Sequence, residues 1–239
     1  MNLSLKAIAI SLVISGGCKT SNVIFSDDFD TQESYYNELT RNATQKEYGE
    51  NALYEGHLLK NWIYSWDYSF DGDWTQAFYV VPKGKDYMEQ AGRSAAPGNY
   101  RLITKTKIPE NVHHYEITFR QFKNDNDPIF YHLGTNEKGD GGVKFGYMNQ
   151  VPETDSTVNR VYMLGDLGEQ IIEDKSYFRK WANHKLSVNS ESKEIKWFVN
   201  GELIFSGQSD KLPHGGHFTL SQKYERGTRY DDIEITALK

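Results

Sequence analysis

The chain has 239 residues, and its 27 Lys and Arg against 33 Asp and Glu give a formal net charge of −6 at pH 7. This balance argues against nucleic acid or an anionic membrane as the main partner, because both require a basic surface. Aromatic residues make up 14% of the chain, which favours strands over helices and also suits surfaces that stack sugar rings.

The first segment, residues 1–17, has the pattern of a secretory signal. Its apolar run, residues 7–14, is too short to span a bilayer. The letters ISGGC that follow resemble a bacterial lipobox with cleavage before Cys18; the alternative is a leader cut elsewhere that leaves a free thiol. We therefore expect a signal peptide over 1–17, a lipid on Cys18 and a tether over 18–22. The protein would then sit in the bacterial cell envelope, attached to a membrane only through its lipid.

The rest of the chain is predicted to be all-β. Residues 31–61 are polar and ambiguous, with room for a short helix, and no helical periodicity is sustained beyond about three turns. Strand-like stretches separated by turn signals follow in chain order at 23–30, 62–81, 101–108, 114–122, 129–135, 143–150, 159–166, 177–208, 216–224 and 228–238. This pattern predicts a single domain over 23–239, a two-sheet antiparallel jelly-roll sandwich.

One hairpin is specified by its turn. The stretch IKWFVNGELIF, residues 195–205, places Asn200-Gly201 between two apolar runs, and both residues tolerate the positive φ of a type I′ turn. Alternation then puts Trp197 and Val199 on one face. Both faces of this hairpin carry apolar residues, so we expect one face to be covered by a second sheet. We assign Trp181 and Trp197 to the core.

The order of several motifs resembles the concanavalin A-like jelly-roll superfamily. The motifs are DDFD at 27–30, YEITFRQF at 115–122, KLSVNSESKEIKWFVNGELIF at 185–205, GHFTLSQ at 216–222 and YDDIEI at 230–235. Within the superfamily, the C-terminal half is most similar to the 3-keto-disaccharide hydrolase domain family and to laminin-G-type modules. The resemblance implies the fold, and carbohydrate binding and cleavage are both common in such proteins. The Glu-x-Asp-x-x-Glu strand of laminarinases is missing from this sequence, which argues against that carboxylate pair.

Candidate catalytic residues follow from strand alternation. In the strand 114–122, Tyr115, Ile117 and Phe119 point one way, and Glu116 and Arg120 point the other way. If the polar faces of three strands line up, a single surface collects Glu116, Arg120, His132, Lys144 and Gln150. The alternative is a solvated sheet face with cross-strand ion pairs.

Two reactions fit these residue types. Glycoside hydrolysis needs two carboxylates; Glu116 would be one, and Asp166 or Glu169 the other. A uronate lyase needs a cation, a base and an acid. Those roles would fall to Arg120 or Lys144 as cation, to His132 as base and to Tyr147 or Tyr162 as acid. The residues do not decide between the two reactions.

Binding and metal residues are predicted separately. Trp62, Trp66 and Trp74 lie in a polar stretch and are candidates for stacking on sugars, with a cluster at the edge of the core as the alternative. Gln150 and Tyr162 complete the expected binding set. By the superfamily resemblance, the first and last strands lie side by side and bind a structural calcium ion, for which Asp28 and Asp232 are the expected ligands. No organic cofactor is expected.

The sequence thus leads to three hypotheses. The first is a cell-envelope lipoprotein, expected to be monomeric, that cleaves a poly- or oligosaccharide as a hydrolase or lyase, in a groove on the concave sheet. The second is a non-catalytic glycan-binding lipoprotein that serves a polysaccharide-utilisation system. The third is a structural envelope module with no ligand. Catalysis requires ionisable groups that converge in one cleft with perturbed pKa values.

Overall fold

The computed structural model describes residues 22–28, 61–66, 77–80, 88–91, 99–123, 128–149, 160–173, 177, 179–223 and 228–239. These residues form 15 strands and no helix. In this part of the chain, no helix is long and apolar enough to cross a membrane. The signal peptide, the tether and Cys18 lie outside the described residues, apart from Asn22 at the end of the tether.

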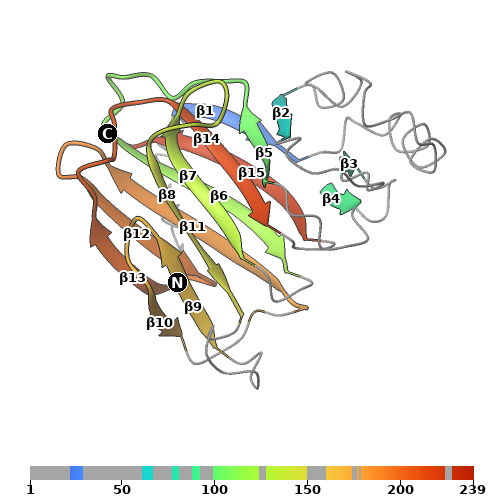
Figure 1. Cartoon of the computed structure of the whole chain (residues 1–239). Coiled ribbons are helices and arrows are strands. Elements are labelled where there is room, and N and C mark those ends of the chain that lie inside the picture. The colour runs from blue at the N-terminus through green and yellow to red at the C-terminus, as the bar shows by residue number, and fades with distance from the viewer. Residues whose placement is uncertain are drawn as a thin grey trace, which may run out of the picture.

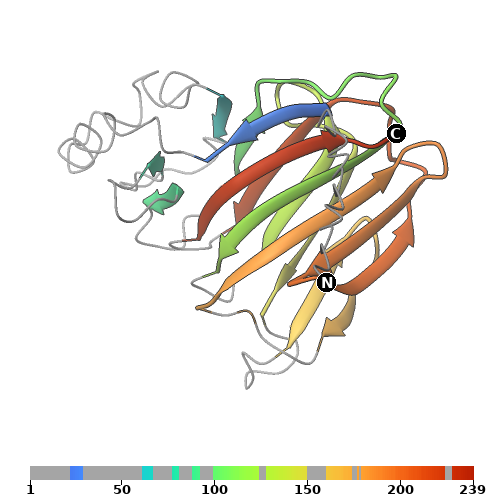
Figure 2. The same cartoon turned by 180° about the vertical axis from the view of Figure 1, so that it is seen from behind.

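Eight of the described strands form one sheet, in the order β13-β12-β11-β6-β15-β4-β3, with β1 also paired to β15. Their bounds are β1 (Asn22–Asp27), β3 (Ala77–Val80), β4 (Met88–Ala91), β6 (His114–Phe122), β11 (Trp181–Asn189), β12 (Glu194–Val199), β13 (Glu202–Gln208) and β15 (Arg229–Ala237). Figure 2 shows β1 in blue against β15 in red, followed by β6 in green and β11 in orange. The first and last described strands therefore lie side by side, as predicted.

The other seven strands form the second sheet, in the order β10-β9-β8-β7-β14-β5-β2 (Figure 1). Their bounds are β2 (Trp62–Trp66), β5 (Asn99–Thr104), β7 (Ile129–Thr135), β8 (Val143–Met148), β9 (Val161–Gly165), β10 (Gln170–Glu173) and β14 (His217–Lys223). All the strand pairs in both sheets are antiparallel. The predicted two-sheet antiparallel sandwich is confirmed.

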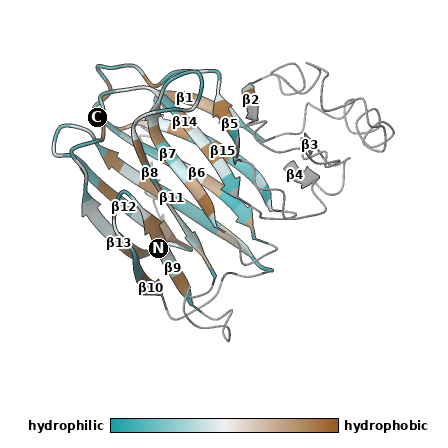
Figure 3. Ribbon diagram, in the orientation of Figure 1, coloured by the Kyte–Doolittle hydropathy of each residue, from teal (hydrophilic) through white to brown (hydrophobic). Residues whose placement is uncertain are grey.

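The core lies between the two sheets. Hydrophobic and hydrophilic residues alternate along the strands (Figure 3), and the apolar ones meet across the sandwich, as Phe119 of β6 and Tyr131 of β7 do with ring centroids 5.2 Å apart. Tyr115, Ile117 and Phe119 are buried, as predicted. Trp197 is also buried, with Tyr147 of the opposite sheet 5.4 Å from it.

Trp181 is a correction to the sequence prediction. It is only half-buried, whereas Ala182 and His184 in the same strand are buried. Since alternate residues of a strand face opposite sides, Trp181 lies on the outer face of the eight-stranded sheet. The small Ala182 occupies the inward position beside it.

The predicted Asn200-Gly201 hairpin is present. Both turn residues have positive φ, 51° for Asn200 and 84° for Gly201, as a type I′ turn requires. Val199 pairs with Glu202 and Phe198 with Leu203, as a two-residue turn requires, and the register then shifts so that Trp197 pairs with Phe205. A β-bulge at this point adds one residue to β13.

Candidate functional site

The predicted polar surface is divided between the two sheets. Glu116 and Arg120 lie on β6 of the eight-stranded sheet, whereas His132 and Lys144 lie on β7 and β8 of the seven-stranded sheet. Both pairs point away from the core, so they lie on opposite sides of the sandwich. The expectation of one shared face is wrong, because the chain crosses from one sheet to the other between β6 and β7.

The outer face of the eight-stranded sheet is a set of cross-strand ion pairs. Glu116 Oε1 lies 3.1 Å from Lys185 Nζ. Arg120 Nη1 lies 3.2 Å from Asp231 Oδ2, and its guanidinium carbon stands 4.8 Å from the centre of the Trp181 ring. Glu116 and Arg120 therefore fit the alternative interpretation, a solvated sheet face with cross-strand ion pairs.

A different polar group lies on the outer face of the seven-stranded sheet. Strands β5, β14, β7 and β8 place Ile103, Thr219, His132 and Lys144 in one cross-strand row. The next row contains Arg101, Ser221 and Phe130. His132 Nε2 lies 2.7 Å from Ser221 Oγ, a hydrogen bond that joins the two rows. The structure thus brings His132 and Lys144 together and adds Arg101 and Ser221 to them.

His132 is held in its neutral form. Although it points away from the core, its exposed fraction is only 5%. Burial, followed by the positive charges of Lys144 and Arg101, lowers its pKa to about 3. At neutral pH the ring is therefore uncharged, with Nε2 engaged by the Ser221 hydroxyl.

Two acidic residues, Asp140 and Asp166, lie close to the cations around His132. Arg101 forms an ion pair with Asp140, and its Nη1 also donates to the carbonyl oxygen of Lys138 at 3.0 Å. Asp166 Oδ1 accepts from Lys211 Nζ at 2.6 Å, and Asp166 Oδ2 accepts from the backbone N–H of Lys144 at 2.8 Å. Burial would raise the pKa of Asp166, but these hydrogen bonds and the lysine charges outweigh it and lower the pKa.

The aromatic ring beneath Lys144 belongs to Phe130. Lys144 Nζ stands 4.0 Å from the centre of this ring, a cation–π contact. Phe130 is itself buried although it points away from the core. The face therefore carries a cation above an apolar surface, beside a neutral imidazole.

The loop after β7 positions Asp140. Asn136 Oδ1 accepts from the N–H groups of Lys138 at 2.8 Å and Asp140 at 3.0 Å, a local side-chain turn typical of Asn. Gly139 packs so closely on the face that an added Cβ would lie 2.8 Å from Arg101 Cδ. This contact holds the loop against the β5 edge of the site.

A pocket of about 400 Å³ lies next to this loop. It is lined by Lys107, Gly134, Thr135, Asn136, Glu137, Asp140, Pro213, His214, Gly215, Gly216 and His217. Thr135 belongs to the same face, because its Oγ1 lies 2.8 Å from Thr219 Oγ1. Asp140 lines the pocket and pairs with Arg101, so the pocket continues the face toward the end of the sandwich.

Comparison with solved structures identifies the architecture. Lectin II from Ulex europaeus superposes with a TM-score of 0.52 at 11% identity, over 75% of this chain and 94% of the lectin. A Bacillus subtilis protein of unknown function with a galectin-like fold gives 0.51 at 10% identity, over 78% and 94%. The chain has a concanavalin A-like jelly-roll fold.

A sialidase matches this jelly roll with a TM-score of 0.50 at 9% identity, over 69% of this chain. The match covers only 17% of the sialidase chain. No family model matches the sequence, and no curated protein matches it. The similarity to the 3-keto-disaccharide hydrolase family stays a prediction.

Two of the predicted site residues lie in the core of the jelly roll. Tyr147 is buried between the sheets, and its hydroxyl donates to Gln121 Oε1 at 3.0 Å. Trp62 has no exposed surface, and its Nε1–H donates to the buried Asp27 Oδ2 at 2.8 Å. Neither side chain is placed to contact a sugar. For Trp62, the structure favours the alternative of a core cluster.

The remaining binding candidates are only partly described. Tyr162 is half-buried on β9, where its buried neighbours Val161 and Met163 place it on the same outer face as Lys144. Trp66 belongs to β2, but its side chain lies outside the described part of the jelly roll. Trp74 and Gln150 are also outside it.

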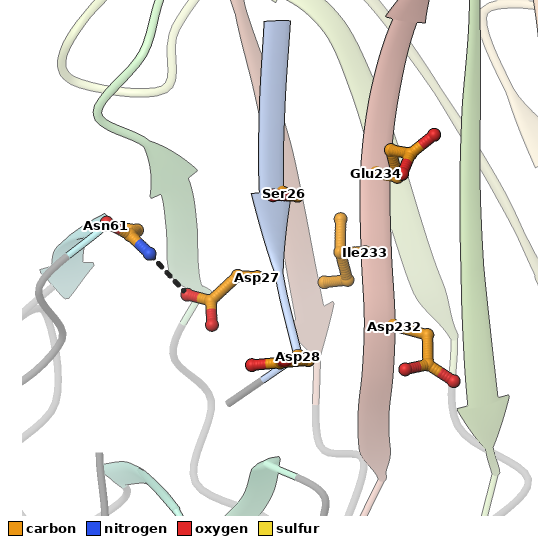
Figure 4. A pocket seen from close by; sticks show the side chains of 7 residues that line it. All are labelled: Ser26, Asp27, Asp28, Asn61, Asp232, Ile233 and Glu234. Carbon is orange, nitrogen blue, oxygen red and sulfur yellow. Dashed lines mark hydrogen bonds between the residues drawn. The ribbon is translucent and has the colours of Figure 1, made fainter. Parts of the chain in front are cut away.

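The predicted calcium ligands line one pocket of about 340 Å³ between β1 and β15. The carboxylates of Asp28 and Asp232 point to opposite sides there (Figure 4), and Asp232 Oδ2 lies 3.5 Å from Arg120 Nη1. Among the described residues, no group of three His, Cys, Asp or Glu side chains is placed to hold a metal ion. Calcium binding at this jelly-roll edge stays a prediction that these side-chain positions do not favour.

Sequence reasoning missed Arg101, Ser221 and Asp140. The stretch GHFTLSQ, residues 216–222, contained the signal for Ser221, because alternation with Phe218 and Leu220 places Thr219 and Ser221 on the polar side. Arg101 alternates with Leu102 in the same way. The Asp140 contact depends on how the loop folds back, which no periodicity reveals.

Proposed function

We propose that the protein binds an acidic oligo- or polysaccharide on the outer face of the seven-stranded sheet. The observation that supports this proposal is the position of Lys144, which lies opposite His132 on this face with its Nζ 4.0 Å from the centre of the Phe130 ring. Lectin II from Ulex europaeus, a carbohydrate-binding protein by its name, has the same fold. The charges, rather than the fold, favour an acidic ligand.

Each group on this face has a role in the proposed complex. A sugar carboxylate or sulfate would pair with Lys144 and with Arg101, since charge-assisted hydrogen bonds are the strong ones. His132 and Ser221, both nearly buried, form the floor and fix the positions of the strands beneath the cations. The half-buried Tyr162 on β9 extends the face and offers a ring and a hydroxyl for a further sugar unit.

Glycoside hydrolysis has less support on this face. Its general acid must be protonated near neutral pH, which requires a raised pKa. The pKa of Asp166 is lowered, Asp140 is paired with Arg101, and Glu116 lies on the opposite face. Binding without hydrolysis is therefore the function that the geometry supports best.

Uronate elimination is a second candidate, supported by the same imidazole. Lys144 and Arg101 would neutralise the uronate carboxylate, and an uncharged His132 would accept the proton next to it. As the glycosidic C–O bond breaks, Tyr162 on the same face would donate a proton to the leaving oxygen. A base whose pKa is about 3 in the free protein is weak. This candidate therefore requires the bound carboxylate to raise the pKa of His132.

Affinity electrophoresis and titration calorimetry test the proposal, with alginate and polygalacturonate as acidic glycans and laminarin as a neutral one. We expect retardation by an acidic glycan and about tenfold weaker binding for Lys144→Ala, the loss of one charge-assisted contact. Lys185→Ala is the matched control, because Lys185 Nζ also stands over a ring, Phe198, at 4.5 Å, but on the opposite sheet face.

Two results would overturn the binding proposal: no acidic glycan is retained, or Lys185→Ala weakens binding as much as Lys144→Ala. Ultraviolet absorbance of unsaturated sugars, followed in the same mixtures, separates elimination from binding. An absorbance increase that His132→Asn abolishes would establish the lyase. Retention with no absorbance increase and no new reducing ends would establish a binding protein.

A further inference from the structure

We propose that His113 and His214 form a binding site for a divalent transition-metal ion such as Zn²⁺, at one end of the sandwich. These residues take no part in the proposed glycan-binding face. They lie on two loops that are far apart in the sequence, yet their Nδ1 atoms are 3.1 Å apart. The rings meet edge to face, at 83° with centroids 4.8 Å apart.

Backbone hydrogen bonds hold the two loops together. Ile108 and Gly216 bond to each other in both directions, at 2.8 and 3.0 Å, and form an isolated bridge. The N–H of Ser190, which follows β11, donates to the carbonyl oxygen of His113 at 2.7 Å. Gly215 has φ +71°, and a Cβ there would lie 2.6 Å from the Ile108 carbonyl oxygen. The histidine positions are therefore fixed by the backbone on both sides.

The spacing of the two nitrogens suits one metal ion. With metal–nitrogen bonds of about 2.05 Å, as in zinc sites, two nitrogens 3.1 Å apart subtend an angle of about 98° at the metal. This angle lies between the octahedral and tetrahedral values of about 90° and 109°. The separation therefore allows both Nδ1 atoms to bind one ion, once rotation of the exposed rings turns both lone pairs toward it.

His214 Nδ1 has more partners than one ring nitrogen can serve well. Ser190 Oγ lies 2.9 Å from it, and His113 Nδ1 lies 3.1 Å from it. A neutral imidazole nitrogen offers either one N–H or one lone pair, so the two partners must share it. A metal ion on the lone pairs of both Nδ1 atoms would remove this competition, with Ser190 Oγ available as a further oxygen.

The acidic residues nearby favour a cation. Glu191 Oε1 lies 4.0 Å from His113 Nε2, and its side chain is largely exposed, so it is free to rotate toward a metal. The Glu110 carboxylate pairs mainly with Lys107, whose Nζ lies 2.9 Å from its Oε1, and interacts only secondarily with His214. Because the described residues contain no group of three His, Cys, Asp or Glu placed for a metal, the protein would supply two imidazoles, and water or a rotated Glu191 would fill the remaining positions.

Such a site would be open rather than closed. His214 also lines the pocket of about 400 Å³ at the end of the glycan-binding face. Water ligands on the ion are exchangeable, as in zinc sites that keep an open position. The bound metal would also join three loops, because His113, His214 and Ser190 each lie on a different loop.

Titration calorimetry with Zn²⁺ on tag-free, chelator-treated protein tests the site. We expect one ion per chain and at least about tenfold weaker binding for His113→Ala and for His214→Ala. His114→Ala is the matched control, since His114 is the exposed neighbour of His113 in the sequence and should bind Zn²⁺ like the parent. Co²⁺ provides a second measurement, because its visible spectrum reports nitrogen coordination.

The proposal is overturned if the parent binds no Zn²⁺, or if the two alanine variants bind it like the parent. It is also overturned if His114→Ala loses binding equally. Thermal melts without metal show whether each variant folds, and His113→Gln replaces His113→Ala if that variant does not. If the protein proves to bind no glycan, the Zn²⁺ titration still tests this site, since the two sites use different residues.

Discussion

Two buried neutral histidines should make the protein less stable as the pH falls. His184 lies in the core, where its ring stacks on Phe119 with centroids 5.0 Å apart and its Nδ1 accepts from Trp197 Nε1 at 3.2 Å. Burial lowers the pKa of His184 to about 3, and the pKa of His132 is also lowered to about 3. Neither ring is protonated in the folded protein at pH 5.

The sign of the effect follows from proton linkage. In the unfolded chain both histidines regain a pKa near 6.5, so below that pH the unfolded state binds protons that the folded state does not. The stability is therefore complete above pH 6.5 and is lost progressively between pH 6.5 and pH 3. At pH 5, which is 1.5 units below 6.5, each histidine lowers the free energy of unfolding by about 2 kcal/mol.

Urea denaturation at pH 8, 7, 6 and 5 measures this loss. Between pH 8 and pH 5 we expect the parent to lose about 4 kcal/mol from its two histidines. His184→Gln and His132→Asn should each lose only about 2 kcal/mol, since one titrating group is gone. Asp166 also has a lowered pKa in the folded protein. It changes the stability only below its ordinary pKa of 3.8, which lies outside the measured range of pH 8 to pH 5. His114→Gln, at an exposed position, is the control and should lose as much as the parent.

A loss below about 1 kcal/mol in the parent would refute the argument, because two buried neutral imidazoles cannot give so little. So would an unchanged pH dependence in both variants. If His184→Gln does not fold, His132→Asn alone still tests the linkage, because His132 lies outside the core.

Three further predictions concern stability, each measured as the free energy of unfolding in urea. Trp62→Phe should lower it by about 1–3 kcal/mol, because a buried carboxylate loses its indole donor; no change would mean that the hydrogen bond is unimportant. Trp197→Ala should lower the free energy of unfolding by about 3–5 kcal/mol, because Trp197 is buried in the core. Trp181→Ala should lower it by much less, because Trp181 is half-buried on the outer face. Equal losses would contradict the placement of these two residues on opposite faces. Gly201→Ala should lower it by about 1–2 kcal/mol from its positive φ alone, since nothing lies within 4 Å of an added Cβ. Gly142→Ala should lower it more, because its Cβ would lie 2.0 Å from a carbonyl oxygen, and the reverse order would refute this comparison.

The strands and their buried faces could be predicted from the sequence, because both depend on local patterns. The alternation in β6 identified Tyr115, Ile117 and Phe119 as core residues, and all three are buried. The Asn200-Gly201 turn fixed its hairpin for the same reason. Neither prediction required any knowledge of distant residues.

The division of strands between sheets could not be predicted in this way. Alternation separates the inward from the outward residues of a strand, but it does not say which sheet the strand joins. Glu116 and His132 were therefore placed on one surface, although β6 and β7 belong to different sheets. The sequence could not decide between a stacking role and a core position for Trp62, because its hydrogen-bond partner, Asp27, lies 35 residues away. The polar residues around a tryptophan in the sequence do not report such a contact.

The pairing of β1 with β15 determines how the fold would respond to force. Asn22 pairs with Ala237, and Asp27 pairs with Ile233, in an antiparallel ladder. A pull between residues 22 and 237 would open this ladder like a zipper, one hydrogen bond after another, rather than shear all its bonds at once. The ladder should therefore yield at low force, and β1 should peel from the sheet edge before the other strands separate.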